Sequence, residues 1–204
     1  MAELTLQQAR EDARQEPFHE PQTSIVIQNI IVSTELTQTL NLELIAFSFP
    51  KEADYRPEQF PAVFFRAKVI RKLVSIFSTG KLVSVGAKTE LEAQTAIQLV
   101  VSELKDAGLT NDGQCKPRVQ NVVATIEFHR PIYLEKAHLI LDRTIYEPEL
   151  FPALIHRSLN PALCYLLFAQ GKAICLGAKS IEDIRSSTQR LESKLEASGA
   201  FVPS

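Results

Sequence analysis

Tryptophan is absent from the 204-residue sequence, methionine occurs once, and there are only three cysteines. Cys115, Cys164 and Cys175 form no C-x-x-C pair, and their odd number argues against a disulfide framework or a cysteine-based zinc site. The four histidines show no H-x-x-x-H spacing, so a histidine-based zinc site is not indicated either. We therefore expect free, mostly buried thiols, no metal and no other cofactor.

An excess of charge of one sign is also lacking, since 22 basic residues stand against 24 acidic ones. A net charge of −2 gives no general attraction to nucleic acid. No stretch approaches the roughly 18 consecutive apolar residues that span a bilayer. Residues 1–22 hold neither an apolar leader core nor an arginine-rich transit pattern. We expect them to form a flexible tail of an intracellular protein.

Signatures of common enzyme classes are missing too. The sequence contains no phosphate-binding G-x-x-x-x-G-K-[ST] and no G-x-S-x-G. We therefore expect no enzymatic activity. With 45% hydrophobic and 23% charged residues, the composition is that of a globular protein rather than of a disordered or collagen-like chain.

The sequence does contain an internal repeat. Residues 55–88 recur as residues 146–179 at a constant offset of 91, with 13 of 34 positions identical. The repeated motifs are Y-x-P-E-x-F-P-A, F-x-x-G-K and G-A-K, and the pair Gln-Asn at 28–29 returns at 120–121. Two copies of this length indicate a duplicated half-domain with pseudo-two-fold symmetry. We predict an N-terminal tail at 1–22, a first repeat at 23–110, a linker at 111–117 and a second repeat at 118–204.

Each half shows the same order of secondary-structure signals. In the first half these predict a strand at 24–36, a short helix at 40–49, and strands at 62–68, 73–78 and 81–85. From Thr89 the apolar period changes to 3.6 and continues to Gly108, which indicates a long helix. The second half repeats this pattern. We therefore predict an α+β fold, with one curved antiparallel sheet of eight to ten strands and the long helices covering one face.

The other face of this sheet is expected to be apolar with two asparagines. Strand alternation and the repeat place on that face Asn29, Ile31, Ser33, Val83, Val85, Asn121, Val123, Thr125, Ile174 and Leu176. Asparagine is depleted in strands, so its symmetrical recurrence there points to a role beyond folding. An apolar patch of this extent marks a binding surface.

The duplicated motifs, in this order and spacing, closely resemble the core of the TATA-box-binding protein family over residues 24–202. The resemblance implies a saddle-shaped fold and a general transcription initiation factor that binds and bends promoter DNA through the minor groove. The family is itself a standard case of minor-groove kinking by inserted side chains. It further implies recruitment of a factor-IIB-type protein and RNA polymerase, in the nucleus, or in the cytoplasm or nucleoid if the source is archaeal. Whether the free protein forms a homodimer stays open.

By the same resemblance, each group of residues takes a role on DNA. Phenylalanines insert between base steps, asparagines and apolar residues contact base edges, and basic residues hold phosphates. The implied inserting residues are Phe60, Phe77, Phe151 and Phe168; those at base edges are Asn29, Ile31, Ser33, Val83, Val85, Asn121, Val123, Thr125, Ile174 and Leu176; those at phosphates are Arg66, Lys88, Arg157 and Lys179. The implied contacts to a factor-IIB-type protein are Glu147, Glu149 and Leu150.

Two departures from the family pattern bear on selectivity and partners. The family usually has a threonine before each G-A-K, where this chain has Val85 and Leu176. Loss of two hydrogen bonds of about 1 kcal/mol each predicts relaxed or altered TATA selectivity, as in a divergent member of the family. The predicted helix at 89–106 is acidic where the family's helix is basic. The sequence therefore does not predict binding of the regulators that need a basic helix at this surface. The alternative function is a protein-interaction scaffold with weak or no productive DNA binding.

Overall fold

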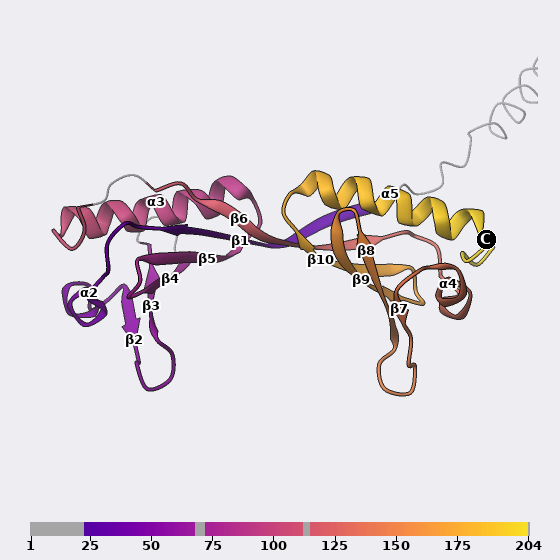
Figure 1. Cartoon of the computed structure of the whole chain (residues 1–204), viewed down its shortest axis with the longest axis horizontal. Coiled ribbons are helices and arrows are strands. Elements are labelled where there is room, and N and C mark those ends of the chain that lie inside the picture. Colours follow the sequence, from indigo (N-terminus) through magenta and orange to yellow (C-terminus); the bar gives the residue numbers. More distant parts are fainter. Residues whose placement is uncertain (1–22, 68–71, 112–114, 204) are drawn as a thin grey trace, which may run out of the picture.

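The computed structural model describes residues 23–67, 72–111 and 115–203, and within them ten strands form one antiparallel sheet. The strand order is β2-β3-β4-β5-β1-β6-β10-β9-β8-β7. The predicted tail at 1–22 and residues 112–114 of the predicted linker lie outside the described residues. The predicted α+β saddle is confirmed: two lobes of similar build are joined by β1 and β6 (Figure 1).

The two halves contain the same elements in the same order. The first half holds β1 (Ser24–Glu35), α2 (Leu42–Ser48), β2 (Ala53–Tyr55), β3 (Ala62–Arg66), β4 (Leu73–Phe77), β5 (Lys81–Ala87) and α3 (Glu90–Asp106). The second half holds β6 (Arg118–Glu127), α4 (Leu134–Ile140), β7 (Thr144–Ile145), β8 (Ala153–Leu159), β9 (Ala162–Phe168), β10 (Lys172–Ala178) and α5 (Ile181–Ala197). The sequence does not predict β2 and β7, because strands of three and two residues are too short to show alternation.

The sheet is continuous because β1 and β6 pair across its centre. Ile30 pairs with Val122. On either side of this pair, Asn29 lies opposite Val123, and Asn121 lies opposite Ile31. These partners exchange places under the offset of the repeat, so a pseudo-two-fold axis passes between Ile30 and Val122.

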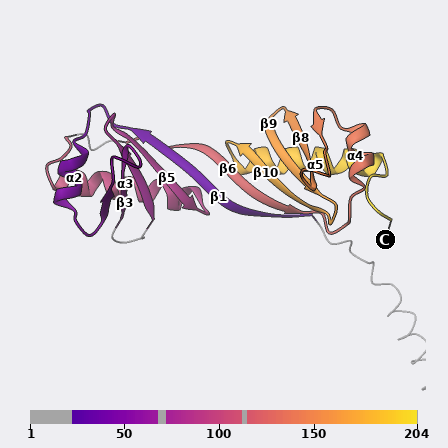
Figure 2. The same ribbon diagram turned by 90° about the horizontal axis from the view of Figure 1, so that it is seen from below.

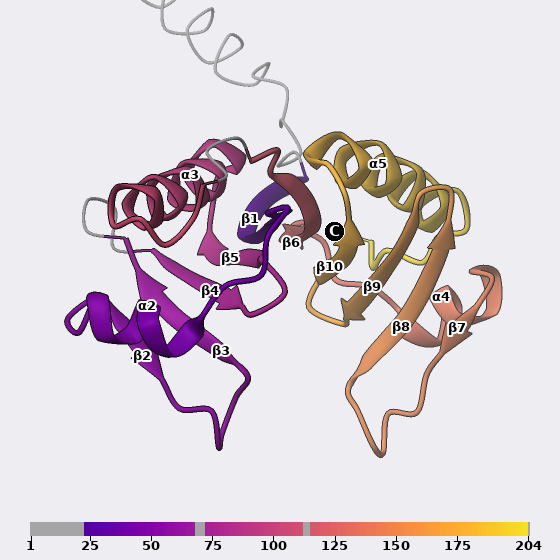
Figure 3. The same ribbon diagram turned by 60° about the vertical axis from the view of Figure 1, so that its left-hand side comes forward.

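Helices α3 and α5 lie on one face of the sheet (Figures 1 and 3). Side chains on that face are buried, and at the centre of the sheet Ile30 and Val122 are each 1% exposed. Helix α3 buries the stripe that its sequence predicts, namely Ala93, Ala96, Ile97, Val100, Val101 and Leu104. Each long helix begins at a side-chain cap, Thr89 for α3 and Ser180 for α5. Full burial of one Leu or Ile stabilises the fold by about 1.5–3 kcal/mol, so these stripes hold the helices on the sheet.

The opposite face of the sheet is concave. In Figure 3 the β2–β3 loop and the β7–β8 loop project on the side away from α3 and α5, one at each end of the sheet. Figure 2 views the molecule from below and shows β1 and β6 crossing between the lobes. The concave face therefore extends over both halves and is continuous at its centre.

Two glycines with positive φ give a test of how tightly the turns are built. Gly171 has φ +88°, and a Cβ added there would lie 2.2 Å from the Arg130 carbonyl oxygen. Gly108 has φ +73°, with nothing within 4 Å of an added Cβ. Gly108→Ala should cost only the backbone term of about 1–2 kcal/mol, whereas Gly171→Ala should cost at least about 3 kcal/mol. Thermal unfolding checks this, and equal melting temperatures for the two variants would contradict it.

Candidate nucleic-acid interface

The concave face is lined by the side chains that alternate with the core. On β3, β4, β8 and β9 the residues pointing to the core are buried, and their neighbours are partly or fully exposed except for Ala62 and Ala153 at the starts of β3 and β8. Along the face lie Asn29, Ile31, Phe64, Leu73, Ser75, Phe77, Val83 and Val85 from the first half, and Asn121, Val123, Thr125, Ile155, Cys164, Leu166, Phe168, Ile174 and Leu176 from the second. The surface is mostly apolar, with two asparagines at its centre.

Ser33 keeps the predicted alternation, because it lies opposite Val83 in the β1–β5 pairing and therefore shares its face. It is only 9% exposed, and it lines a polar hollow together with Lys81 and Arg118. The register of β1 shifts beside Ser33, between Ile30 and Val32 against β5 and between Ile31 and Val32 against β6. The symmetrical Thr125 has equivalent shifts beside it, between Ala124 and Val123 against β1 and between Ala124 and Val122 against β10, and it is partly exposed.

Each asparagine is fixed by a backbone amide of its own half. The Gly86 N–H donates to Asn29 Oδ1 at 2.8 Å, and the Gly177 N–H donates to Asn121 Oδ1 at 2.9 Å. A backbone N–H can only donate, so the accepting atom of each side chain must be the carbonyl oxygen. Among the described residues neither Asn29 Nδ2 nor Asn121 Nδ2 has a partner. Both NH₂ groups are therefore available as donors.

The glycines that donate to these asparagines have an unusual backbone conformation. Gly86 and Gly177 have φ of +88° and +93°, a region that favours glycine. The Lys72 ammonium donates to the Gly86 carbonyl at 3.2 Å and pairs with Glu92 at 2.9 Å. The hydrogen bond from Lys72 lowers the pKa of the Glu92 carboxyl. Lys72 thus links the first-half G-A-K turn to the start of α3, a role that the sequence pattern does not reveal.

Two pairs of phenylalanine rings stand at the ends of the face. Phe60 and Phe151 are 40% and 42% exposed. The Phe60 ring meets the Phe77 ring edge to face at 5.9 Å, and the Phe151 ring meets the Phe168 ring likewise at 6.4 Å. All four rings are partly exposed rather than buried in the core, and the two pairs are related by the repeat.

The first pair has an additional ring beneath it. Phe64 stacks on Phe60 with 5.3 Å between ring centroids and an interplanar angle of 10°. The second half has Ile155 at the equivalent position. The two ends of the face are therefore unequal. Alternation along β3, β4, β8 and β9 would have found Phe64, Leu73, Ser75, Ile155, Cys164 and Leu166, which the motif comparison alone misses.

The predicted phosphate-binding residues lie at the surface. Arg66, Arg157, Lys88 and Lys179 are all exposed. The Lys179 ammonium donates to the Gln120 carbonyl at 2.6 Å, which holds it beside β6. Val85 and Leu176 lie immediately before Gly86 and Gly177, so apolar side chains occupy the positions next to the glycine–asparagine hydrogen bonds, which we call the asparagine cradles.

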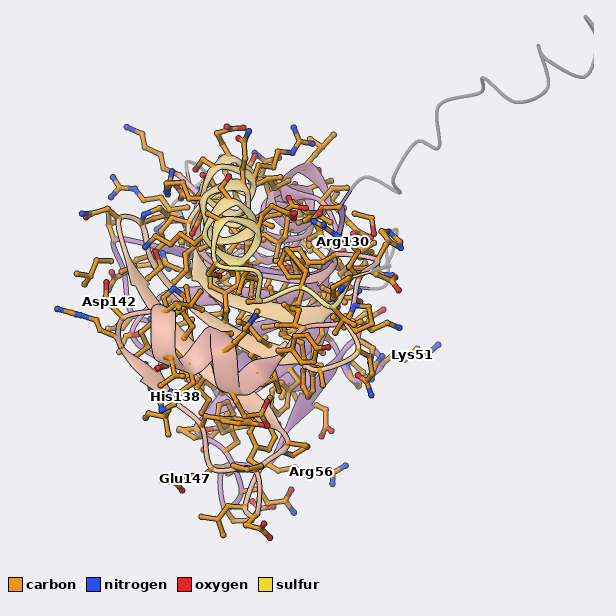
Figure 4. All side chains as sticks on the ribbon, turned by 90° about the vertical axis from the view of Figure 1, so that its right-hand side faces the viewer. Lys51, Arg56, Arg130, His138, Asp142 and Glu147 are labelled. Atoms are coloured by element: carbon orange, nitrogen blue, oxygen red, sulfur yellow. The ribbon has the colours of Figure 1, made fainter. Side chains whose placement is uncertain are left out.

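The predicted partner loop forms the tip between β7 and β8. Backbone amides of Leu150 and Phe151 both donate to the Glu147 carbonyl at 2.9 Å, which closes a tight turn. Leu150 is 81% exposed, and Glu149 is exposed beside it. In Figure 4, Glu147 and its first-half counterpart Arg56 lie at the tips of the two projecting loops. The two tips therefore differ in charge.

Other kinds of site are not formed by the described residues. Within them, no three His, Cys, Asp or Glu side chains gather as metal ligands, and no helix is long and apolar enough to cross a membrane. The three cysteines are free, as predicted, although only Cys175 is fully buried. Burial raises the pKa of the Cys175 thiol to about 11.

Comparison with known proteins agrees with this geometry. The family model described as transcription factor TFIID (or TATA-binding protein, TBP) matches residues 24–107 and 116–197. The TATA-box-binding protein of Pyrobaculum aerophilum is 38% identical over 175 residues, which cover 86% of this chain and 87% of the relative. That of Pyrodictium occultum is 36% identical over 184 residues, covering 90% and 92%.

A solved structure supports the same assignment. Methanococcus jannaschii TBP superposes with a TM-score of 0.76 and 35% identity, covering 85% of this chain and 99% of that one. Sequence family, overall shape and the duplicated arrangement of the concave face therefore agree. The chain belongs to the TATA-binding protein family, a family of general transcription initiation factors that bind promoter DNA.

Proposed function

We propose that the concave face binds promoter DNA in the minor groove and bends it. The observation that carries this proposal is the orientation of Asn29 and Asn121, whose carbonyl oxygens are occupied and whose NH₂ groups are left as donors. An A·T pair presents only acceptors in the minor groove, whereas a G·C pair adds the guanine amino donor. Two donors beside the pseudo-two-fold axis therefore suit A·T pairs at the centre of the bound site.

Bending is supported by the exposed rings at the two ends of the face. Unstacking a base step costs a few kcal/mol, so rings that enter a step must be supported by other contacts. The apolar face supplies these, at about 25 cal/mol per Å² of apolar surface buried. Phe60 with Phe77 would enter at one end of the site, and Phe151 with Phe168 at the other.

Selectivity among A·T-rich sequences is proposed to be relaxed. Val85 and Leu176 lie beside the asparagine cradles and carry no polar atom. They can fill space against sugars and base edges but cannot donate to a base acceptor. The remaining selectivity would come from the two asparagines and from the ease with which particular base steps kink.

Partners and location are proposed on the same basis. The loop with Glu147, Glu149 and Leu150 would bind a factor-IIB-type protein, which in turn brings RNA polymerase. The relatives compared above are archaeal, so we propose the cytoplasm or nucleoid rather than the nucleus. A homodimer through the concave face of the free protein stays a prediction. A scaffold without productive DNA binding is the second candidate, favoured by Val85 and Leu176.

Reversing the two asparagine donors should abolish binding. In the double variant Asn29→Asp/Asn121→Asp, a carboxylate oxygen still accepts from each glycine amide, so the fold is kept. Negative acceptors then face the base acceptors, and affinity for an A·T-rich duplex should fall at least about 100-fold, since each such pair is worth 1–3 kcal/mol. Mobility-shift titration measures this. Gln28→Glu/Gln120→Glu changes the charge equally at neighbouring exposed positions, and an equal loss there would reject the donor assignment.

Removing one ring pair should remove one kink. Phe151→Ala/Phe168→Ala should shift energy transfer between dyes at the two DNA ends part of the way back to the value of the unbound duplex, because no side chain then holds the step open at that end. Leu150→Ala, next to Phe151 and more exposed, is the control and should leave the transfer as in the unmodified complex. If the double variant gave the unmodified transfer, the wedge assignment would be wrong.

Placing hydroxyl groups beside the asparagine cradles should increase the selectivity for TATA over G·C-substituted DNA. Val85→Thr/Leu176→Thr adds two donors toward base acceptors, worth about 1 kcal/mol each, so discrimination between TATA and G·C-substituted duplexes should rise about 30-fold. Competition binding measures the ratio. Val85→Ala/Leu176→Ala removes apolar bulk without adding a hydroxyl and should not raise the ratio. No gain in the threonine variant would contradict this explanation of relaxed selectivity.

A further inference from the structure

The outer end of the second half carries a hollow lined with cations. Arg143, Arg157, Arg190 and Lys194 line it, together with the single carboxylate of Asp142. Arg143 precedes β7, Arg157 is on β8, and the other two lie one turn apart on α5. Asp142 is labelled in Figure 4, where nitrogen-tipped side chains project into solvent on the same side of the ribbon. We refer to these four cations as the second-half basic cluster.

One side chain of the basic cluster, Arg190, is held by a backbone contact, and a second contact links the backbone of two others. Arg190 Nη2 donates to the Asn160 carbonyl at 2.7 Å, which fixes this guanidinium beside the β8–β9 turn. The Arg157 backbone N–H donates to the Arg143 carbonyl at 3.1 Å, which ties β8 to the preceding turn. Among the described residues, none of the four cations forms an ion pair. Their charges are therefore not neutralised within this part of the chain.

The buried His156 adds no charge to the hollow. His156 lies under the hollow, 7% exposed, with Nδ1 2.9 Å from the Asp142 carbonyl. Burial lowers its pKa, the Lys194 charge lowers it further, and the contact with Asp142 opposes both. The imidazole is thus kept neutral at pH 7, and the net charge of the hollow comes from the four cations and one carboxylate.

The basic cluster is present in only one of the two repeats. At the offset of 91 residues, Glu52, Leu99 and Glu103 stand where the second half has Arg143, Arg190 and Lys194. Only Arg157 has a basic counterpart, which is Arg66. A surface with three additional cations in one half alone suits an anionic partner bound at one end of the molecule.

The position of the basic cluster indicates which anion it meets. Arg157 is on the same side of β8 as Ile155, so the cluster begins at the rim of the concave face. Strand β8 starts two residues after Phe151 and ends beside the cluster, a span of about 23 Å at 3.3 Å per residue. A duplex seated against this face would bring a sugar–phosphate backbone across that strand end. An arginine guanidinium can donate hydrogen bonds to two phosphate oxygens at once. Four cations suit an array of phosphates better than one small ion.

We propose that the second-half basic cluster binds the phosphate backbone of promoter DNA, and that Arg143, Arg190 and Lys194 extend this grip beyond Arg157 at one end only. The proposal rests on the proposed function of the concave face. The contacts position the duplex and set the salt dependence of binding, without reading sequence. An acidic protein is the competing occupant of such a surface.

The test is the salt dependence of DNA binding by Arg190→Gln/Lys194→Gln, measured by fluorescence anisotropy between about 50 and 200 mM salt. Loss of two phosphate contacts should lower the slope of log K against log salt by about 2 and weaken binding about tenfold at the low-salt end. The loss should be equal on A·T-rich and G·C-substituted duplexes. Lys194→Gln alone, which removes no side-chain hydrogen bond among the described residues, should lower the slope by about 1 and serves if the double variant fails to fold.

The control is Lys105→Gln/Arg185→Gln, which changes the net charge equally at exposed positions on α3 and α5 outside the hollow. Its slope should equal that of the unmodified protein. Equal slopes for all three proteins, as expected if the cluster binds an acidic protein, would overturn the inference. So would an equal fall in both double variants, or a loss confined to one duplex. If the unmodified protein bound neither duplex, the proposed function itself would fail, a result distinct from these.

Discussion

The antiparallel pairing of β1 with β6 is the interaction on which the rest of the molecule depends. Without it, each half would end in an unpaired strand edge beside an apolar face. The pairing is centred between Ile30 and Val122, so it places Asn29 and Asn121 on either side of the axis, and the repeat relates the two ring pairs to each other. Because side chains alternate along a strand, a slip of one residue would turn both asparagines into the helical layer.

Function on this surface comes from local arrangement rather than from total charge. The chain has a net charge of −2, yet cations gather at the rim of the concave face and in the second-half basic cluster, while the face itself is apolar. Two asparagine donors lie at the centre of the concave face, pairs of phenylalanine rings lie at its ends, and cations lie at its rim. In the proposed function, this division assigns sequence reading, deformation of the duplex and phosphate contacts to different residues.

The repeat made most of the fold predictable from the sequence. It fixed the number of halves, their symmetry and the long helices, because a 3.6-residue stripe and paired motifs leave few alternatives. The bulges in the central strands and the short strands β2 and β7 depend on pairing with distant strands and leave no local signal. The same holds for the amide contacts that orient Asn29 and Asn121, and for the basic cluster, whose members are far apart in sequence. The predicted roles of the site residues on DNA stay predictions.

Minor-groove recognition is tested most directly by exchanging base pairs that differ in only one groove. Hypoxanthine·cytosine pairs present the minor-groove acceptors of A·T pairs but the major-groove pattern of G·C pairs, because hypoxanthine lacks the guanine amino group. We expect a duplex with such pairs throughout the box to bind with the affinity of the A·T duplex. Affinity as low as that of the G·C duplex would show that the concave face does not read the minor groove.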